Sequence, residues 1–365
     1  MPGNFCINFL ISMGFSMTMV CRISTLWKYR DMRTLIIENS RIRLVILLDK
    51  GADIIELRYK PLDLDLMWHS PTGWRNPVME TSPNPNNMGG FLDYYGGGWQ
   101  DIVPSAGGAS VTHRGAALGI HGESSMLPWS CEILEDGVEE VSAHLWVEGV
   151  RYPFRLDKWI EVRRDEEKLY VRERLSNPSN QALEYSWLQH PSFGEPFLEP
   201  KCKIRIPTPA EVIVLEGEHL GRLQPGTYEW PTVAGKDGKP IDLSIIPSRE
   251  IVAEETSFIA NMREGWYILS NPKLDLGFGL AWDIGVYRYL WFWQNYNAPD
   301  YPWYGTAWNI ALEPCTSYPG GLPAQIQRKT HITIPPKGHL ETSLTAFVLS
   351  NPEKIGKLDV RGESE

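Results

Sequence analysis

Two residues able to transfer protons, His190 and Glu313, each lie in an apolar segment rich in aromatic residues. His190 belongs to the sequence WLQHPSFG at 187–194, and Glu313 follows the apolar pair Ala311 and Leu312. The ordinary pKa of histidine is the nearest to neutrality of all side chains, and a carboxylate in a Trp-rich pocket gains basicity by desolvation. Such a pair can give a proton to one oxygen of a substrate while taking a proton from another.

Three separate segments combine reactive side chains with glycines and aromatic rings: 96–129, 187–194 and 290–314. A carbohydrate cleft needs polar groups for the hydroxyls and flat rings for the apolar face of the sugar. The Gly-rich run 96–98 leads into Trp99, Gln100 and Asp101, which we expect to line this cleft. The aromatic cluster at 291–304 is expected to serve both core and cleft, because indoles alternate sides along a strand.

The elements that must position these groups are predicted to be strands. Short apolar runs are punctuated by turn residues, and the chain contains 32 Gly, 28 Pro, 15 Trp and 15 Tyr. This pattern favours an all-β, antiparallel fold with few short helices. An opening meander is predicted at 35–38, 41–48 and 54–59, and a hairpin loop at 165–167. Two long loops are predicted at 70–98 and 225–240, the second with a tight turn at 236–239.

The chain shows no repeat and no linker, which favours a single β domain over 32–350. Residues 1–31 are predicted to be a poorly ordered leader or an upstream extension, with Met17, Met19 or Met32 as alternative starts. The uncharged segment 4–20 lacks the basic flank and the cleavage site of a signal peptide. The charged tail at 351–365 is expected to fray.

Charge and cysteine usage narrow the class of partner. A net charge of −10 and a pI near 5.4 argue against nucleic acid, so a neutral small molecule is expected. The five cysteines are widely spaced, which supports neither a disulfide framework nor a metal site and fits a reducing cytoplasm. Beyond 4–20 no apolar stretch is long enough for a membrane span. The oligomeric state stays open, a homodimer included.

The order of three motifs resembles that of the aldose 1-epimerase family, within the galactose mutarotase-like superfamily. The strand VRERLSN at 171–177 leads into HPSF at 190–193, which is similar to the HPYF-type motif of the family. His121-Gly122 resembles its HG pair, and ALEP at 311–314 resembles its late Glu motif, followed by a closing strand after PKG at 336–338. The resemblance extends from about residue 34 to 348 and suggests a divergent branch.

The resemblance implies a galactose mutarotase-like β-supersandwich that interconverts the anomers of a sugar without metal or organic cofactor. In that scheme His190 is the general acid, Glu313 is the general base, and His121 binds near the ring oxygen. Trp293 or Gln294 would take the place of a binding Gln of the family. The binding Asp of the family has no clear counterpart, and its binding Arg has only Arg58; the Asp candidates are Asp237, Asp242 and Asp283.

Two other functions remain open at this point. His121 and Glu123, joined by His190, could ligate a metal in a cupin-like sugar isomerase, which bound Mn, Fe or Zn would reveal. A non-catalytic carbohydrate-binding protein could use the same tryptophans as stacking platforms. An acid and a base in the expected order favour catalysis.

Overall fold

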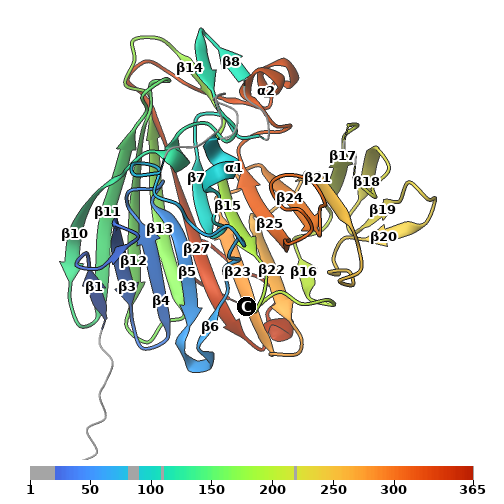
Figure 1. Cartoon of the computed structure of the whole chain (residues 1–365), viewed down its shortest axis with the longest axis horizontal. Helices are drawn as coiled ribbons and strands as arrows, with labels where there is room; N and C mark the ends of the chain where they lie inside the picture. The colour runs from blue at the N-terminus through green and yellow to red at the C-terminus, as the bar shows by residue number, and fades with distance from the viewer. Residues whose placement is uncertain (1–20, 81–89, 108–110, 218–219, 365) are drawn as a thin grey trace, which may run out of the picture.

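The computed structural model of the chain describes residues 21–80, 90–107, 111–217 and 220–364. Within them, two large antiparallel sheets pack face to face; α2 and the hairpins that contain β8 and β14 lie at the top of the view, and the β19–β20 hairpin lies at its right edge (Figure 1). The predicted all-β class is therefore confirmed. Over the same residues, no helix has the length and apolar character needed to cross a membrane.

The larger sheet carries the candidate catalytic residues. In spatial order its strands are β1 (Arg22–Ser24), β3 (Met32–Glu38), β4 (Ile42–Leu47), β5 (Asp53–Tyr59), β7 (Trp99–Ile102), β15 (Leu188–Phe193), β25 (Trp308–Cys315), β24 (Tyr289–Tyr296), β21 (Ala253–Ala260), β17 (Glu211–Val214) and β18 (Gly226–Glu229). Two short strands extend it, β2 (Lys28–Tyr29) beside β3 and β6 (Leu64–Asp65) beside β5. His190 and Glu313 thus sit on neighbouring strands, β15 and β25.

The second sheet covers the inner face of the first. Its order is β10 (Ser130–Asp136), β11 (Glu140–Glu148), β12 (Arg155–Arg163), β13 (Lys168–Ser176), β27 (His339–Ser350), β23 (Leu276–Trp282), β22 (Trp266–Asn271) and β16 (Lys203–Arg205). Apolar side chains of both sheets form one hydrophobic core, with Leu44 and Leu312 from the first and Ile160 and Phe278 from the second. Burial of this apolar area is the main force that holds the sheets together.

Smaller elements close the ends of the sandwich. Three hairpins pair β8 (Val111–His113) with β9 (Ala116–Leu118), β14 (Leu183–Tyr185) with β26 (Ile332–Ile334), and β19 (Thr232–Ala234) with β20 (Pro240–Asp242). The helices are α1 (Gly90–Tyr94), α2 (Leu322–Arg328) and the 3₁₀ turns η1 (Lys60–Leu62), η2 (Ser124–Met126) and η3 (Pro352–Lys354). In Figure 1, α1 lies beside β7 and β15, near the centre of the larger sheet.

The opening meander and the hairpin at 165–167 are confirmed, because β3, β4 and β5 pair in sequence and β12 pairs with β13. The prediction of a loop over 225–240 is wrong in part, since β18 and β19 lie within it. The tight turn inside that segment is confirmed: the Gly238 N–H donates to the carbonyl of Gly235, and the Gly235 N–H donates to that of Lys239. Short strands were missed because each spans only three or four residues.

Both predicted ends differ from expectation where the structure describes them. Residues 1–20 of the proposed leader lie outside the described residues, but residues 22–24 pair with β3, and Cys21 and Ile23 are buried in the core. The tail after residue 351 packs against the second sheet, with Leu358 only 2% exposed. Arg205 donates to the carbonyl of Ile355 at 2.8 Å. The prediction that the tail frays was based on its charges and is wrong, because its few apolar residues pack against the second sheet.

A buried polar network bridges the two sheets. The Lys158 Nζ of β12 lies 2.7 Å from the Asp101 Oδ2 of β7 and 3.8 Å from Glu173 of β13. The Gln189 amide of β15 donates to Asp101, to Glu173 and to the Tyr287 hydroxyl. Burial opposes the charge on Asp101, but Lys158 outweighs it and lowers the pKa of Asp101. Burial and the charge of Asp101 raise the pKa of Glu173 well above its usual range, so the ion pair is Lys158 with Asp101.

Replacing Lys158 by Met should leave Asp101 as a buried, unpaired carboxylate. We expect the free energy of unfolding to fall by about 3–5 kcal/mol, the usual cost of breaking a buried pair from one side. Urea denaturation followed by far-UV circular dichroism measures this change.

Lys273→Met is the matched control, because Lys273 pairs with Glu199 at 3.1 Å while its side chain is 73% exposed. Exposed pairs contribute less than about 1 kcal/mol. Equal losses in the two variants would show that the buried pair does not anchor the sheets.

Candidate active site

The register of β15 and β25 places His190 opposite Glu313. The two strands pair Leu188 with Cys315 and Ser192 with Ala311, and in an antiparallel ladder the residues midway between them face each other. Directly opposite residues point to the same face of a sheet. His190 and Glu313 therefore share the face that is turned away from the second sheet.

The same register places residues of five neighbouring strands in one row with His190 and Glu313. Gln100 on β7 is opposite His190, and Trp291 on β24 is opposite Glu313. Two residues along, Trp293 is opposite both Ala311 of β25 and Thr256 of β21. The candidate site is thus built on the most regular part of the sheet, where register determines which side chains meet.

His190 and Glu313 form a close, buried pair. The His190 Nε2 and Glu313 Oε1 atoms are 3.5 Å apart, and the two side chains are 4% and 3% exposed. Burial, with a contribution from the nearby Lys50 ammonium, lowers the pKa of His190 to about 4. Burial raises the pKa of Glu313 well above its usual range. The site therefore favours the uncharged forms of both groups and holds a single proton on the pair over a wide pH range.

The second ring nitrogen of His190 faces two hydroxyls. The Tyr95 hydroxyl lies 3.4 Å from His190 Nδ1 and is hydrogen-bonded to the Ser192 hydroxyl, which lies 3.5 Å from the same nitrogen. Burial raises the pKa of Tyr95 well above its usual range, so its hydroxyl keeps its proton. Tyr95 and Ser192 orient the imidazole so that its Nε2 atom points toward Glu313.

His121 enters the site from a tight turn. It has a positive φ of 56°, and its Nδ1 accepts a hydrogen bond from the Gly107 N–H at 3.4 Å. Because Nδ1 is the acceptor, Nε2 carries the hydrogen of the neutral ring. A side chain at Gly122 would meet the Val103 carbonyl at 2.5 Å, which explains the glycine after the histidine. The ring centroids of His121 and His190 are 5.2 Å apart.

A cavity of about 490 Å³ opens over the pair. Its walls are largely aromatic, and the centroids of the Trp293 and Trp303 rings are 5.9 Å apart. The helix α1 supplies part of the rim through Phe91, whose ring stacks on Tyr95 at 4.9 Å. The lining residues are Phe91, Leu92, Tyr95, Ile120, His121, His190, Leu220, Glu254, Glu255, Thr256, Trp291, Trp293, Asp300, Tyr301, Pro302, Trp303 and Glu313. Its size and lining suit a ligand the size of a monosaccharide.

Three predicted binding residues, Trp99, Asp101 and Gln294, lie on the other face of the sheet. Asp101 pairs with Lys158 between the sheets, and the Trp99 indole donates to Gln189 at 2.8 Å. The Gln294 carbonyl accepts from Arg222 at 3.1 Å. The prediction that these residues line the cleft is wrong, because it treats neighbours in sequence as members of one face, whereas successive side chains of a strand point to opposite faces of the sheet.

Gln100 lies on the face of His190 but beneath the cavity. Its amide donates to Asp53 at 3.0 Å and to the carbonyl of Gly97 at 2.6 Å, and it is fully buried. Gln100 thus supports the floor of the site and does not line the cavity. Of the predicted substrate-binding residues, His121 and Trp293 line it.

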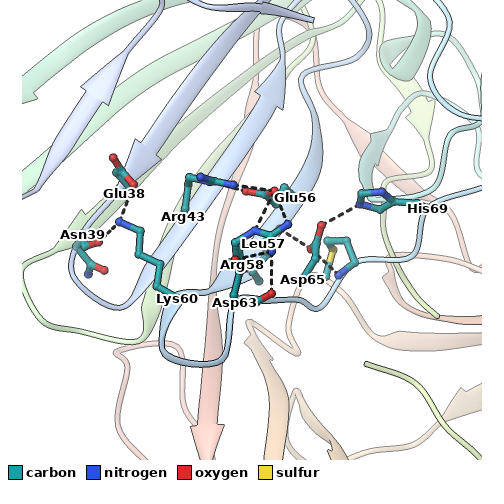
Figure 2. A network of polar contacts seen from close by, with 11 residues as sticks. Glu38, Asn39, Arg43, Glu56, Leu57, Arg58, Lys60, Asp63, Asp65 and His69 are labelled. Carbon is teal, nitrogen blue, oxygen red and sulfur yellow. Dashed lines mark hydrogen bonds and ion pairs between the residues drawn. The ribbon is translucent and has the colours of Figure 1, made fainter. Parts of the chain in front are cut away.

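The candidates for the missing Arg and Asp are occupied elsewhere. Figure 2 shows Arg58 bonded to Glu56 and to Asp63, in a polar network at the β5–β6 hairpin. Asp237 and Asp242 accept backbone N–H groups in the loops around β20. Asp283 does so in the turn after β23, and none of the four lines the cavity.

The proposed metal ligands His121 and Glu123 diverge. The Glu123 carboxylate accepts the backbone N–H groups of Val150, Arg151 and Tyr152 at 3.0–3.2 Å, so it anchors a loop. Over the described part of the chain, no group of three His, Cys, Asp or Glu side chains is arranged to hold a metal ion. This donor geometry does not fit the cupin-like alternative.

Three residues of the site were missed by sequence reasoning: Tyr95, Ser192 and Glu254. Ser192 was within reach, since it lies two residues after His190 on the same strand and so shares its face. Tyr95 falls in the segment predicted as a long loop. Glu254 carries no local motif, and only the pairing of β21 with β24 reveals its position.

Comparison with known proteins bears on the fold and the family. The family described as Domain of unknown function (DUF4432) matches residues 29–348. No curated protein matches the chain by sequence.

Several solved structures share its architecture. A Klebsiella pneumoniae protein described as a candidate aldose 1-epimerase is similar at a TM-score of 0.67 and 17% identity, over 91% of this chain and 84% of that one. A galactose mutarotase-like protein from Clostridium acetobutylicum has a TM-score of 0.63 and 12% identity, over 91% and 99%. A galactose mutarotase related enzyme from Lactobacillus acidophilus has a TM-score of 0.57 and 15% identity, over 87% and 98%.

At these identities the likeness establishes the fold, a galactose mutarotase-like β-sandwich, and confirms the predicted fold class. The low identities are consistent with a divergent branch of that fold. Because the matched family spans most of the chain, the protein belongs to the family described as Domain of unknown function (DUF4432).

Proposed function

We propose that the protein is a carbohydrate mutarotase that interconverts the α and β anomers of a sugar, with His190 and Glu313 as its acid–base pair. The observation that carries this proposal is the 3.5 Å approach of His190 Nε2 and Glu313 Oε1 at the base of an aromatic cavity. The solved structures named as mutarotase-like share the fold, which supports the reaction class without naming the sugar.

Anomer exchange needs two proton transfers at neighbouring oxygens. Opening a pyranose ring removes the proton of the anomeric hydroxyl and adds a proton to the ring oxygen, and closure on the other face reverses both transfers. In the proposed reaction Glu313 takes the hydroxyl proton and His190 protonates the ring oxygen. His121, whose Nε2 carries hydrogen, lies close enough to His190 to bind the ring oxygen or an adjacent hydroxyl.

The proton balance of the pair matches this sequence. In the resting site the single proton of the pair is on Glu313, so the reaction begins when this proton passes to His190 across the 3.5 Å between them. Ring opening then converts cationic His190 with anionic Glu313 into two neutral groups, and ring closure restores the charges. Burial favours the neutral state of both residues, which is the state that accompanies the open-chain aldehyde. The site thereby lowers the free energy of the ring-opened intermediate relative to water.

The variants His190→Asn and Glu313→Gln should each slow anomer exchange by about 10²–10⁴-fold, the usual contribution of a positioned acid or base. Freshly dissolved α-anomers of a panel of aldoses, followed by polarimetry and by NMR exchange at the anomeric carbon, provide the rates.

His339→Asn and Glu341→Gln are matched controls, because both residues lie on β27 of the second sheet and are solvent-exposed. They should keep the wild-type rate. Wild-type rates in His190→Asn or Glu313→Gln would refute the assignment. Binding of a sugar without acceleration of its exchange would favour the non-catalytic carbohydrate-binding alternative.

The pH dependence of kcat/KM should report the displaced pKa values of the pair. A histidine with a lowered pKa stays neutral until the pH falls to that pKa. Activity should therefore persist through slightly acid pH and fall only as the pH approaches about 4. At that pH His190 is protonated while Glu313 also holds its proton, so the pair carries two protons in place of one. The alkaline fall should come above the usual range of a glutamate, where Glu313 loses its proton. An acid limb at the ordinary histidine value of about 6.5 would contradict a buried, neutral His190.

A further inference from the structure

The charged groups that line the cavity are carboxylates. Glu254, Glu255, Asp300 and Glu313 line it together with the imidazoles of His121 and His190. Among the described lining residues there is no Lys or Arg. The internal segments 81–89, 108–110 and 218–219, which the structure does not describe, also contain none.

Two cations close to the cavity are paired with carboxylates. Lys50 lies behind the Phe91 ring and is 2.5 Å from the Asp53 carboxylate. Arg222 is 2.6 Å from the Glu255 carboxylate. Glu255 alternates with Glu254 along β21, so its carboxylate belongs to the opposite face of the strand. Neither cation is left to balance Glu254.

Glu254 lies at the end of the cavity away from the acid–base pair. It is opposite Asn295 on β24, whereas Glu313 is opposite Trp291, four residues or about 13 Å back along that strand. A hexose with its anomeric carbon at Glu313 would therefore direct its distal substituents toward Glu254.

The surroundings of Glu254 are apolar and negatively charged. Its carboxyl faces the indoles of Trp293 and Trp303, and burial raises its pKa. Hydrogen bonding to the two indoles opposes this rise, and the charge of Asp300, which also lines the cavity, adds to it. Any negative group on a ligand would meet repulsion from both carboxylates.

We propose that Glu254 and Asp300 restrict this cavity to sugars without a negative charge, so that the substrate is an unphosphorylated, uncarboxylated sugar. This inference rests on the proposed function only for the orientation of the sugar. Phosphate recognition in proteins uses Arg, Lys or converging backbone N–H groups, and the lining provides no such cation. The carboxylate of Glu254 against the indoles and the exposed carboxylate of Asp300 instead suit hydroxyl groups, which donate hydrogen bonds to the carboxylates while the rings cover the apolar sugar face.

Fluorescence quenching tests the charge of the cavity without any knowledge of the sugar. Iodide, caesium and acrylamide serve as anionic, cationic and neutral quenchers at constant ionic strength. The signal of Trp293 is isolated as the difference between the wild-type protein and Trp293→Phe. Each ion is referred to its own quenching of free N-acetyltryptophanamide, and on this scale we expect caesium to quench Trp293 at least about threefold more effectively than iodide, because opposite charges attract at short range.

The double variant Glu254→Gln/Asp300→Asn should abolish this preference. Glu341→Gln/Glu353→Gln is its matched control, since it removes two exposed carboxylates, one on β27 and one on η3, and leaves the same net charge. Quenching of Trp293 by iodide as effective as that by caesium in the wild-type protein would overturn the proposal. An equal loss of preference in the control would also do so.

Exchange assays then separate this inference from the proposed function. Glucose and glucose 6-phosphate, and galactose and galacturonate, form pairs that differ in one charged group. Acceleration of a neutral sugar at least tenfold greater than that of its anionic partner supports both proposals. Equal or faster exchange of the anionic partner refutes the charge restriction and leaves the mutarotase assignment intact. Acceleration of no sugar refutes the mutarotase assignment, and the quenching result still decides the charge restriction.

Discussion

The strict alternation of side chains along five paired strands is the constraint on which the rest of the structure depends. On β7, β15, β25, β24 and β21, one set of side chains faces the second sheet and the next set faces the cavity. Asp101 and Gln189 belong to the first set, and His190, Glu313 and Trp293 belong to the second. A slip of one residue would exchange the sets, so the chemistry of the outer face depends on the register that the buried inner face enforces.

The inner face enforces register through charges as well as through apolar packing. Asp101 on β7 and Gln189 on β15 are directly opposite, and both bind groups that come from the second sheet. A shifted register would leave Lys158 buried beside apolar side chains, which is far more costly than a cavity. The network therefore selects one pairing of the two strands, and this pairing places His190 in its row.

Burial gives the pair His190 and Glu313 its chemical character. In water at neutral pH the glutamate would be ionised and the imidazole partly protonated, whereas in the cavity desolvation favours the neutral form of each. Lys50 adds to the effect on His190 from behind the site. A pair that passes easily between its charged and neutral states is suited to a reaction that moves one proton in each direction.

The fold class could be predicted from the sequence by local patterns, and His190 and Glu313 could be selected as candidates from those patterns and from the order of short motifs. The alternation of apolar and polar residues indicates strands, and His190 and Glu313 lie in apolar runs where a polar residue is unusual. The binding shell could not be predicted in the same way. Trp99, Gln100 and Asp101 are neighbours in sequence, but successive side chains of a strand point to opposite faces of the sheet, so the three do not share one cleft.

Other parts of the site depend on long-range pairing. Glu254 meets Trp293 only because β21 pairs with β24, and Tyr95 meets His190 only because α1 and the residues that follow it lie over β15. The two residues of each contact are far apart in the sequence, so no local sequence pattern predicts either contact. The packed tail around Leu358 was missed for a similar reason, since its partners lie on β22 and β27.

The most direct test of the account is the charge of the His190 imidazole in the folded protein. Selective ¹⁵N labelling of histidine, with His190→Asn to assign the signal, reports the protonation of its ring nitrogens by NMR across the pH range. The account predicts a neutral ring at neutral pH that becomes cationic only near pH 4. A ring that is cationic at neutral pH would contradict the claim that burial opposite Glu313 makes the two residues a neutral, single-proton pair.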